Sequence, residues 1–191
     1  HKPYILSSGN GLTSMDIYNY LYCVGRIGMD CSGFVWYILS RTAKAGGIDL
    51  VRRFGSLLRA PHGVEPAFYV GTSLFDSGSG EFLQIEDNIE NLKPGDIILF
   101  RDRDGTMAHS AVIQSVNFDA GVIRYLQCTD EAPYDERGVH ESTIQFDPTR
   151  TNVSLKDTSL RWSQSRLSPF PGERPSPYSS DAQRYRAFPE S

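Results

Sequence analysis

Cysteine is scarce in this sequence, which has three among its 191 residues. Cys23, Cys31 and Cys128 can form at most one disulfide, so a disulfide framework is excluded and at least one thiol stays free. We expect Cys31 to be a free thiol.

The chain also lacks long apolar runs and an excess of positive charge. No stretch approaches the roughly 20 apolar residues that a membrane-spanning helix needs. The formal net charge of -4 gives nucleic acid no electrostatic attraction. No signal-peptide pattern is visible, but the chain begins at His1, so this says little about export.

A hydrophobic share of 39% and a charged share of 22% suit one globular domain with a sizeable core. We expect this domain over residues 1–149, followed by an extension at residues 150–191 that is rich in proline and serine. Such an extension lies extended across a surface or is disordered. Its aromatic residues favour docking on the domain: Phe170, Tyr178, Tyr185 and Phe188.

Apolar residues recur at helical spacing in two early segments. They predict helices over residues 13–21 and 31–45, and the second ends where Gly46 follows. Residues 50–58 indicate a short basic helix, and residues 68–70 a brief strand.

From about residue 92 the pattern changes to that of strands. Apolar and alternating runs predict four strands, over residues 97–100, 108–116, 122–128 and 139–146. His109 and Ala111 share one face of the second strand. A hairpin that turns near Asp119 would bring His109 roughly opposite Gln127.

Cys31 lies where the second helix is expected to begin. Only a thiolate is a good sulfur nucleophile, and the partial positive charge of a helix start favours that form. Asp30 precedes the thiol, and the small residues Ser32 and Gly33 leave room for a substrate carbonyl. Taken alone, a cysteine beside an apolar segment is more often a buried small hydrophobe.

His109 and Gln127 change this interpretation. Cysteine hydrolases need an imidazole to take and return the proton, and a third polar group to hold the other ring nitrogen. The carbonyl oxygen of Gln127 can accept the ring N–H of His109. Helix packing against the sheet would then bring Cys31 to His109.

A metal site is the alternative for the same residues. Cys31, His109 and Cys128 offer metal-binding atoms but lack paired-ligand spacing. His62 and His140 fall in loop or strand-edge positions and receive no role. We therefore expect neither a metal nor a cofactor.

Three sequence boxes resemble one family when taken together and in this order. They are Asp-Cys-Ser-Gly-Phe-Val at residues 30–35, Leu-Lys-Pro-Gly-Asp-Ile-Ile-Leu-Phe at 92–100, and Ala-His-Ser-Ala-Val-Ile at 108–113. They are similar to boxes of the NlpC/p-sixty superfamily of papain-like cysteine peptidases. The resemblance covers roughly residues 13–128.

The resemblance implies an α+β, papain-like fold with N-terminal helices packed on a central antiparallel sheet. It implies hydrolysis of amide bonds in bacterial cell-wall stem peptides, commonly the D-γ-glutamyl to diamino-acid bond, through a thioester. It makes Cys31 the nucleophile, His109 the general base and acid, and Gln127 the third residue, which is often His in the family.

The resemblance also implies a substrate site and a setting. Tyr22 matches a tyrosine that shapes the substrate and oxyanion site, and Asp30 and Ser32 match positions that hold the free amino end of the stem peptide. An extracytoplasmic monomer with a peptidoglycan-derived peptide as its substrate is expected. Departures such as Arg26 in place of a second glycine affect the substrate more than the catalytic core.

Two other functions use the same residues. A thiol acyltransferase or deamidase would also employ Cys31, although in the lipid-linked acyltransferase relatives the histidine precedes the cysteine. A silent binding module would hold this thiol oxidised or occluded.

Overall fold

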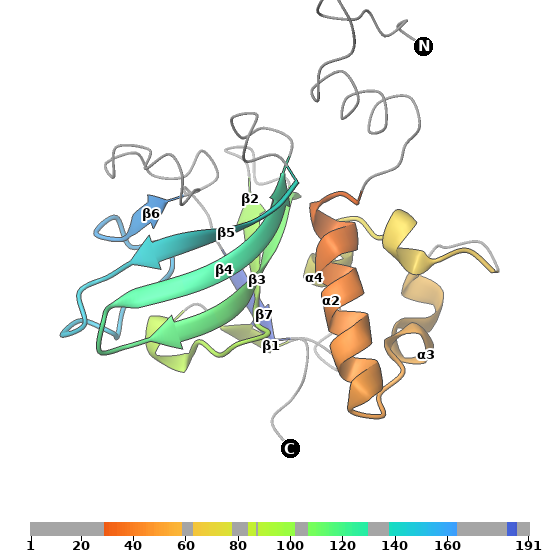
Figure 1. Cartoon of the computed structure of the whole chain (residues 1–191), viewed down its shortest axis with the longest axis horizontal. Coiled ribbons are helices and arrows are strands. Elements are labelled where there is room, and N and C mark those ends of the chain that lie inside the picture. Colours follow the sequence, from red (N-terminus) through yellow and green to blue (C-terminus); the bar gives the residue numbers. More distant parts are fainter. Residues whose placement is uncertain are drawn as a thin grey trace, which may run out of the picture.

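The computed structural model describes residues 29–58, 63–77, 84–86, 88–101, 107–129, 138–163 and 183–186. Over these ranges the fold is α+β, with the α-helices α2, α3 and α4 grouped on one side of a curled antiparallel sheet (Figure 1). The predicted helix at residues 13–21, Tyr22 and Cys23 lie outside the described residues. Within them, no helix is long and apolar enough to cross a membrane.

Of the helices in the described ranges, one is longer than five residues. The α-helices are α2 (Cys31–Ala45), α3 (Leu50–Phe54) and α4 (Ser73–Ser77), and the 3-10 helices are η2 (Gly55–Leu57), η3 (Pro66–Phe68) and η4 (Ile89–Asn91). The prediction of a helix over residues 31–45 is confirmed at both ends. The helix predicted over residues 50–58 ends as a 3-10 turn.

The strand predicted at residues 68–70 is wrong. Pro66 opens the 3-10 helix η3, and its carbonyl accepts the N–H groups of Tyr69 at 2.8 Å and Val70 at 3.0 Å. Proline fixes φ near the helical value, so it favours a turn at this position over an extended segment.

Within the described residues, seven strands form one sheet in the order β1-β7-β2-β3-β4-β5-β6. Their bounds are β1 Gln84–Glu86, β2 Ile97–Arg101, β3 Met107–Asn117, β4 Val122–Thr129, β5 Gly138–Gln145, β6 Arg161–Ser163 and β7 Gln183–Arg186. The four predicted strands are confirmed as β2 to β5. The strands β6 and β7 come from the expected extension, and β7 pairs with both β1 and β2.

The two faces of the sheet belong to two hydrophobic cores. Ile97 and Leu99 of β2 pack with α2 in the first core, around Val35 and Trp36. The opposite face of the sheet lies in the second core, which includes Ile98, Phe100, Ala111, Tyr125 and Trp162. Residues after 149 also contribute here, because Leu155, Leu160 and Trp162 are buried.

Gly121 closes the turn between β3 and β4 against the end of β5. Its φ of +62° is one that other residues rarely adopt, and a Cβ here would clash with the Phe146 carbonyl oxygen. The Phe146 N–H donates to the Gly121 carbonyl at 2.8 Å. The turn therefore requires glycine for two separate reasons.

Gly121→Ala should lower the free energy of unfolding by about 2–4 kcal/mol, because left-handed strain adds to the clash with Phe146. Gly47→Ala is the matched control, since Gly47 also has a positive φ of +78° but a Cβ added there would meet no atom within 4 Å. It should lose only about 1 kcal/mol. Urea denaturation measures both, and equal losses would contradict the role of the close approach.

Candidate functional site

Asp30 is the N-cap of α2 and makes Cys31 the first residue of the helix. Its Oδ1 accepts the Gly33 N–H at 2.6 Å, which satisfies one of the free donors of the first turn. Cys31 is a half-buried free cysteine. The thiol therefore lies at a helix start, as the sequence predicts.

The Ser32 hydroxyl makes its hydrogen bonds within the protein. It is only 2% exposed, and its Oγ lies 2.6 Å from the Val70 carbonyl oxygen and 3.0 Å from Asp30 Oδ1. A hydroxyl carries one hydrogen, and these two acceptors compete for it. The Ser32 hydroxyl therefore ties the helix to residue 70, and the contact of Ser32 with a substrate stays a prediction.

Residues 67–72 run along the first turn of α2. A Cβ on Gly33 would clash with the Ala67 carbonyl oxygen, so this approach depends on glycine. Further along the segment, Thr72 Oγ1 lies 3.7 Å from Cys31 Sγ. The segment thus forms one wall around the thiol, and no pattern in the sequence pointed to it.

His109 and Gln127 meet as predicted. His109 Nε2 and Gln127 Oε1 are 2.8 Å apart, and the two residues are 4% and 2% exposed. The register differs from the expectation, because Ala111 pairs with Gln127 and His109 lies two residues away on the diagonal. Long side chains on the same face still touch across a diagonal.

A bulge in β3 puts these two side chains on one face. Ser115 pairs with Arg124, but Ile113 pairs with Tyr125, so Gln114 is left over. A slip of one residue exchanges the faces of a strand. Without the bulge at Gln114, Gln127 would pair with Val112 and lie on the opposite face from His109.

The hydrogen bonds continue from Gln127 into the second core. Gln127 Nε2 donates to Ser142 Oγ at 2.8 Å, and Ser142 also hydrogen-bonds Tyr125. With the amide held this way, its oxygen accepts the Nε2 hydrogen of His109. The neutral imidazole then carries its lone pair on Nδ1, which is the nitrogen that can act as a base.

The start of α2 and the His109–Gln127 pair lie at the same end of the sheet. The thiol of Cys128, the residue after Gln127, donates to the Met29 carbonyl at 3.0 Å, two residues before Cys31. Helix α2 packs on β3 and β4, and its start lies beside the end of β4 (Figure 1).

Cys31 and His109 approach this end from different faces. His109 stacks near Phe100, with ring centroids 5.4 Å apart, on the face of the second core. Helix α2 covers the other face. Among the described residues, the Cys31 thiol is within hydrogen-bond distance of the Thr72 hydroxyl. Catalytic hydrogen bonds are often long without substrate and tighten only when it binds.

The remaining candidates have other positions. His140 Nδ1 lies 3.0 Å from the Gly138 carbonyl oxygen, and His62 lies outside the described residues. In the ranges that the structure describes, no three His, Cys, Asp or Glu side chains group as metal ligands.

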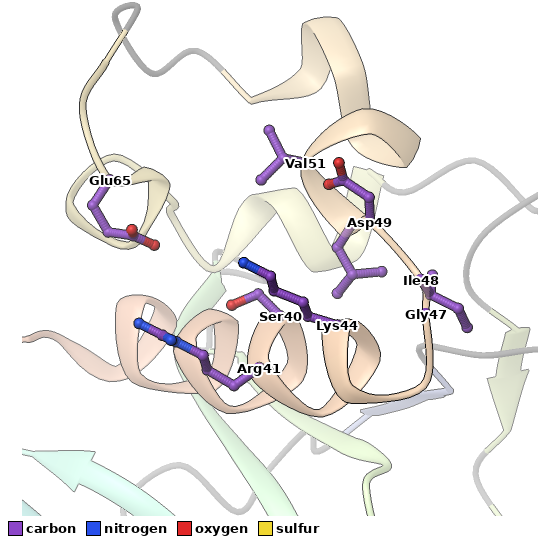
Figure 2. A pocket seen from close by; sticks show the side chains of 9 residues that line it. Ser40, Arg41, Lys44, Gly47, Ile48, Asp49, Val51 and Glu65 are labelled. Carbon is purple, nitrogen blue, oxygen red and sulfur yellow. The ribbon is translucent and has the colours of Figure 1, made fainter.

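A cleft of about 510 Å³ lies on the outer side of α2, where Arg41 and Lys44 face Asp49 and Glu65 (Figure 2). It begins at Ser40, nine residues beyond Cys31, which is about 14 Å along a helix. It is therefore a concavity separate from the thiol.

No protein-family model matches this chain, and comparison with curated proteins and with solved structures finds no match. The chemistry assigned to the site therefore rests on its own residues and on the resemblance of the three boxes.

Tyr125 makes the free energy of unfolding depend on pH in the alkaline range. Burial raises the pKa of its hydroxyl, and the hydrogen bond with Ser142 lowers it by less. Above roughly pH 10 the unfolded chain loses this proton while the folded protein keeps it, so stability falls as the pH rises.

Tyr125→Phe should therefore lose less stability than the parent protein between pH 10 and pH 11.5, by up to about 1.4 kcal/mol per pH unit. Urea denaturation across this range measures the difference between the two proteins, so other tyrosines cancel. Parallel curves would contradict the preferential binding of the Tyr125 proton by the folded state.

Proposed function

We propose that this chain is a papain-like cysteine hydrolase that cleaves amide bonds in cell-wall stem peptides. The observation that carries the proposal is the 2.8 Å contact between His109 Nε2 and Gln127 Oε1. It gives His109 the tautomer that a cysteine nucleophile requires, at the end of the sheet where the helix of Cys31 begins.

The reaction proceeds in two stages. The Cys31 S–H bond breaks as its proton passes to His109 Nδ1, and the thiolate attacks the amide carbonyl. His109 then returns the proton to the leaving amine, and a thioester forms. Water, deprotonated by the same imidazole, hydrolyses the thioester and restores the thiol.

The oxyanion of each tetrahedral intermediate needs hydrogen-bond donors. Asp30 occupies the Gly33 N–H, and the Asp30 carbonyl accepts the Phe34 N–H at 2.9 Å. Among the described hydrogen bonds of the helix start, this leaves the N–H groups of Cys31 and Ser32 for the oxyanion. Tyr22 would add its hydroxyl, as the resemblance implies.

The substrate class follows from the resemblance and from the exposed carboxylate of Asp30. An acidic group next to the nucleophile attracts the free amino end of a stem peptide. The proposed bond is the D-γ-glutamyl to diamino-acid amide, cleaved by a monomer outside the cytoplasm.

Cys31→Ala should abolish cleavage of purified muropeptides, because no other group supplies the nucleophile. Mass spectrometry of the digest identifies the bond cleaved, and a mass gain on a co-substrate would instead indicate acyl transfer. Cys23→Ser is the thiol control and should retain activity. Full activity of Cys31→Ala would exclude Cys31 as the nucleophile, and an inactive parent protein would contradict the proposed substrate.

Gln127→Leu should lower kcat/KM by about 10- to 100-fold, because it releases His109 Nε2 from its acceptor. Gln127→His should keep most of the activity, since a second imidazole can accept the same N–H. Steady-state kinetics at pH 7 with thermal melts of both variants separate this effect from unfolding. Equal losses in the two variants would argue against an orienting role.

A further inference from the structure

The Cys31 thiol has a partner that the proposed mechanism does not use. Thr72 Oγ1 lies 3.7 Å from Cys31 Sγ, although the two residues are 41 positions apart in sequence. We propose that Thr72 is a positioning residue that donates its hydroxyl hydrogen to the Cys31 thiolate. This inference deepens the proposed function and rests on it for its role in cleavage, whereas the hydrogen bond itself can be tested without a substrate.

The surroundings of Thr72 hold it firmly. The residue is 9% exposed, and Val70 and Phe75 on either side of it are buried. The Leu74 N–H donates to the Gly71 carbonyl at 2.9 Å, and the Phe75 N–H donates to the Thr72 carbonyl at 3.1 Å. These bonds begin α4 and fix the backbone of Thr72 opposite the start of α2.

The same segment is attached to α2 at a second point. Ser32 Oγ contacts the Val70 carbonyl oxygen at 2.6 Å. Ser32 directly follows Cys31, and Val70 lies two residues before Thr72. A threonine side chain is stiff at χ1 because its Cβ is branched. The hydroxyl of Thr72 therefore faces the sulfur with little conformational freedom of its own.

In the proposed reaction, the Cys31 thiolate can accept a hydrogen bond from Thr72 and still face His109. When the S–H proton moves to His109 Nδ1, the sulfur becomes an acceptor with more than one lone pair. The Thr72 O–H bond stays intact and donates to one of them, while the imidazolium faces another. A hydrogen bond to the charged form favours that form, so Thr72 makes the thiolate easier to generate.

Thr72→Val tests this directly, because it replaces the hydroxyl with a methyl group of similar size. The rate at which iodoacetamide alkylates Cys31, followed by peptide mass spectrometry, should fall about tenfold at pH 6. At pH 10 the rates of parent and variant should converge, since thiols in general ionise at that pH without help from a neighbouring hydroxyl. Thr72→Ser should restore most of the rate at pH 6.

Alkylation of Cys128 in the same samples is the internal control and should not change. Equal alkylation of Cys31 at pH 6 in the parent and Thr72→Val would overturn the proposal. A deficit of the same size at pH 10 would overturn it too, because it would assign the effect to access. Faster alkylation in Thr72→Val would also overturn the proposal, because it would show that the Thr72 hydroxyl lowers the reactivity of the thiol.

The readout separates this inference from the proposed function, because alkylation needs no substrate. If Thr72→Val shifts the alkylation profile but the parent protein cleaves no muropeptide, the role of Thr72 stands and the hydrolase proposal fails. If the parent cleaves muropeptides and the profile does not move, the hydrolase proposal stands and the role of Thr72 fails.

Discussion

A slip of one residue in β3 governs how the candidate site is assembled. The bulge at Gln114 brings the side chains of His109 and Gln127 to one face, where they bond at 2.8 Å. A second irregularity occurs between β2 and β3, where Phe100 pairs with His109 but Arg101 pairs with Met107. Bulges bend strands and redirect side chains, and they are frequent beside functional sites. Here they bracket the histidine on both sides.

The two halves of the site are built by different physical means. His109 and Gln127 are buried, and their hydrogen bonds run through Ser142 to Tyr125 in the second core. A buried network of this kind is costly to leave unsatisfied, so it fixes both the imidazole and its tautomer. The thiol half is more open. Cys31 is half-buried at a helix start that is held by its cap Asp30 and by the segment of residues 67–72.

Local sequence patterns predicted the parts of the fold that depend on local periodicity. Helix α2 has apolar residues at helical spacing and a capping aspartate, and strands β2 to β5 have apolar or alternating runs. The strands β6 and β7 have three and four residues, too few for a period to appear, and β7 joins the sheet through pairing with β1 and β2. The turn at Pro66 had a local signal, its proline, which the aromatic residues after it outweighed in the prediction.

The site shows the same division between local and long-range information. Cys31, His109 and Gln127 could be selected by residue type and order, and the contact of His109 with Gln127 followed from a hairpin. Gln114 could not be identified as the bulged residue, because an exposed glutamine near the end of a strand is common in sequences. The contact of Thr72 with Cys31 spans 41 positions and depends on how α4 packs against α2.

The proton transfer that we propose for the site is shaped by the same two halves. A rigid imidazole buried on one face of the sheet cannot travel far toward a thiol that lies on a helix across the other face. The sulfur, which moves by rotation about a single bond, is the more mobile partner. In the proposed mechanism a donor such as Thr72, beside the helix start, would let the sulfur keep one hydrogen bond while it exchanges its proton with the imidazole. The burial of His109 and the partial exposure of Cys31 are complementary in the proposed mechanism, because one would fix the direction of the base and the other would leave the nucleophile free to meet it.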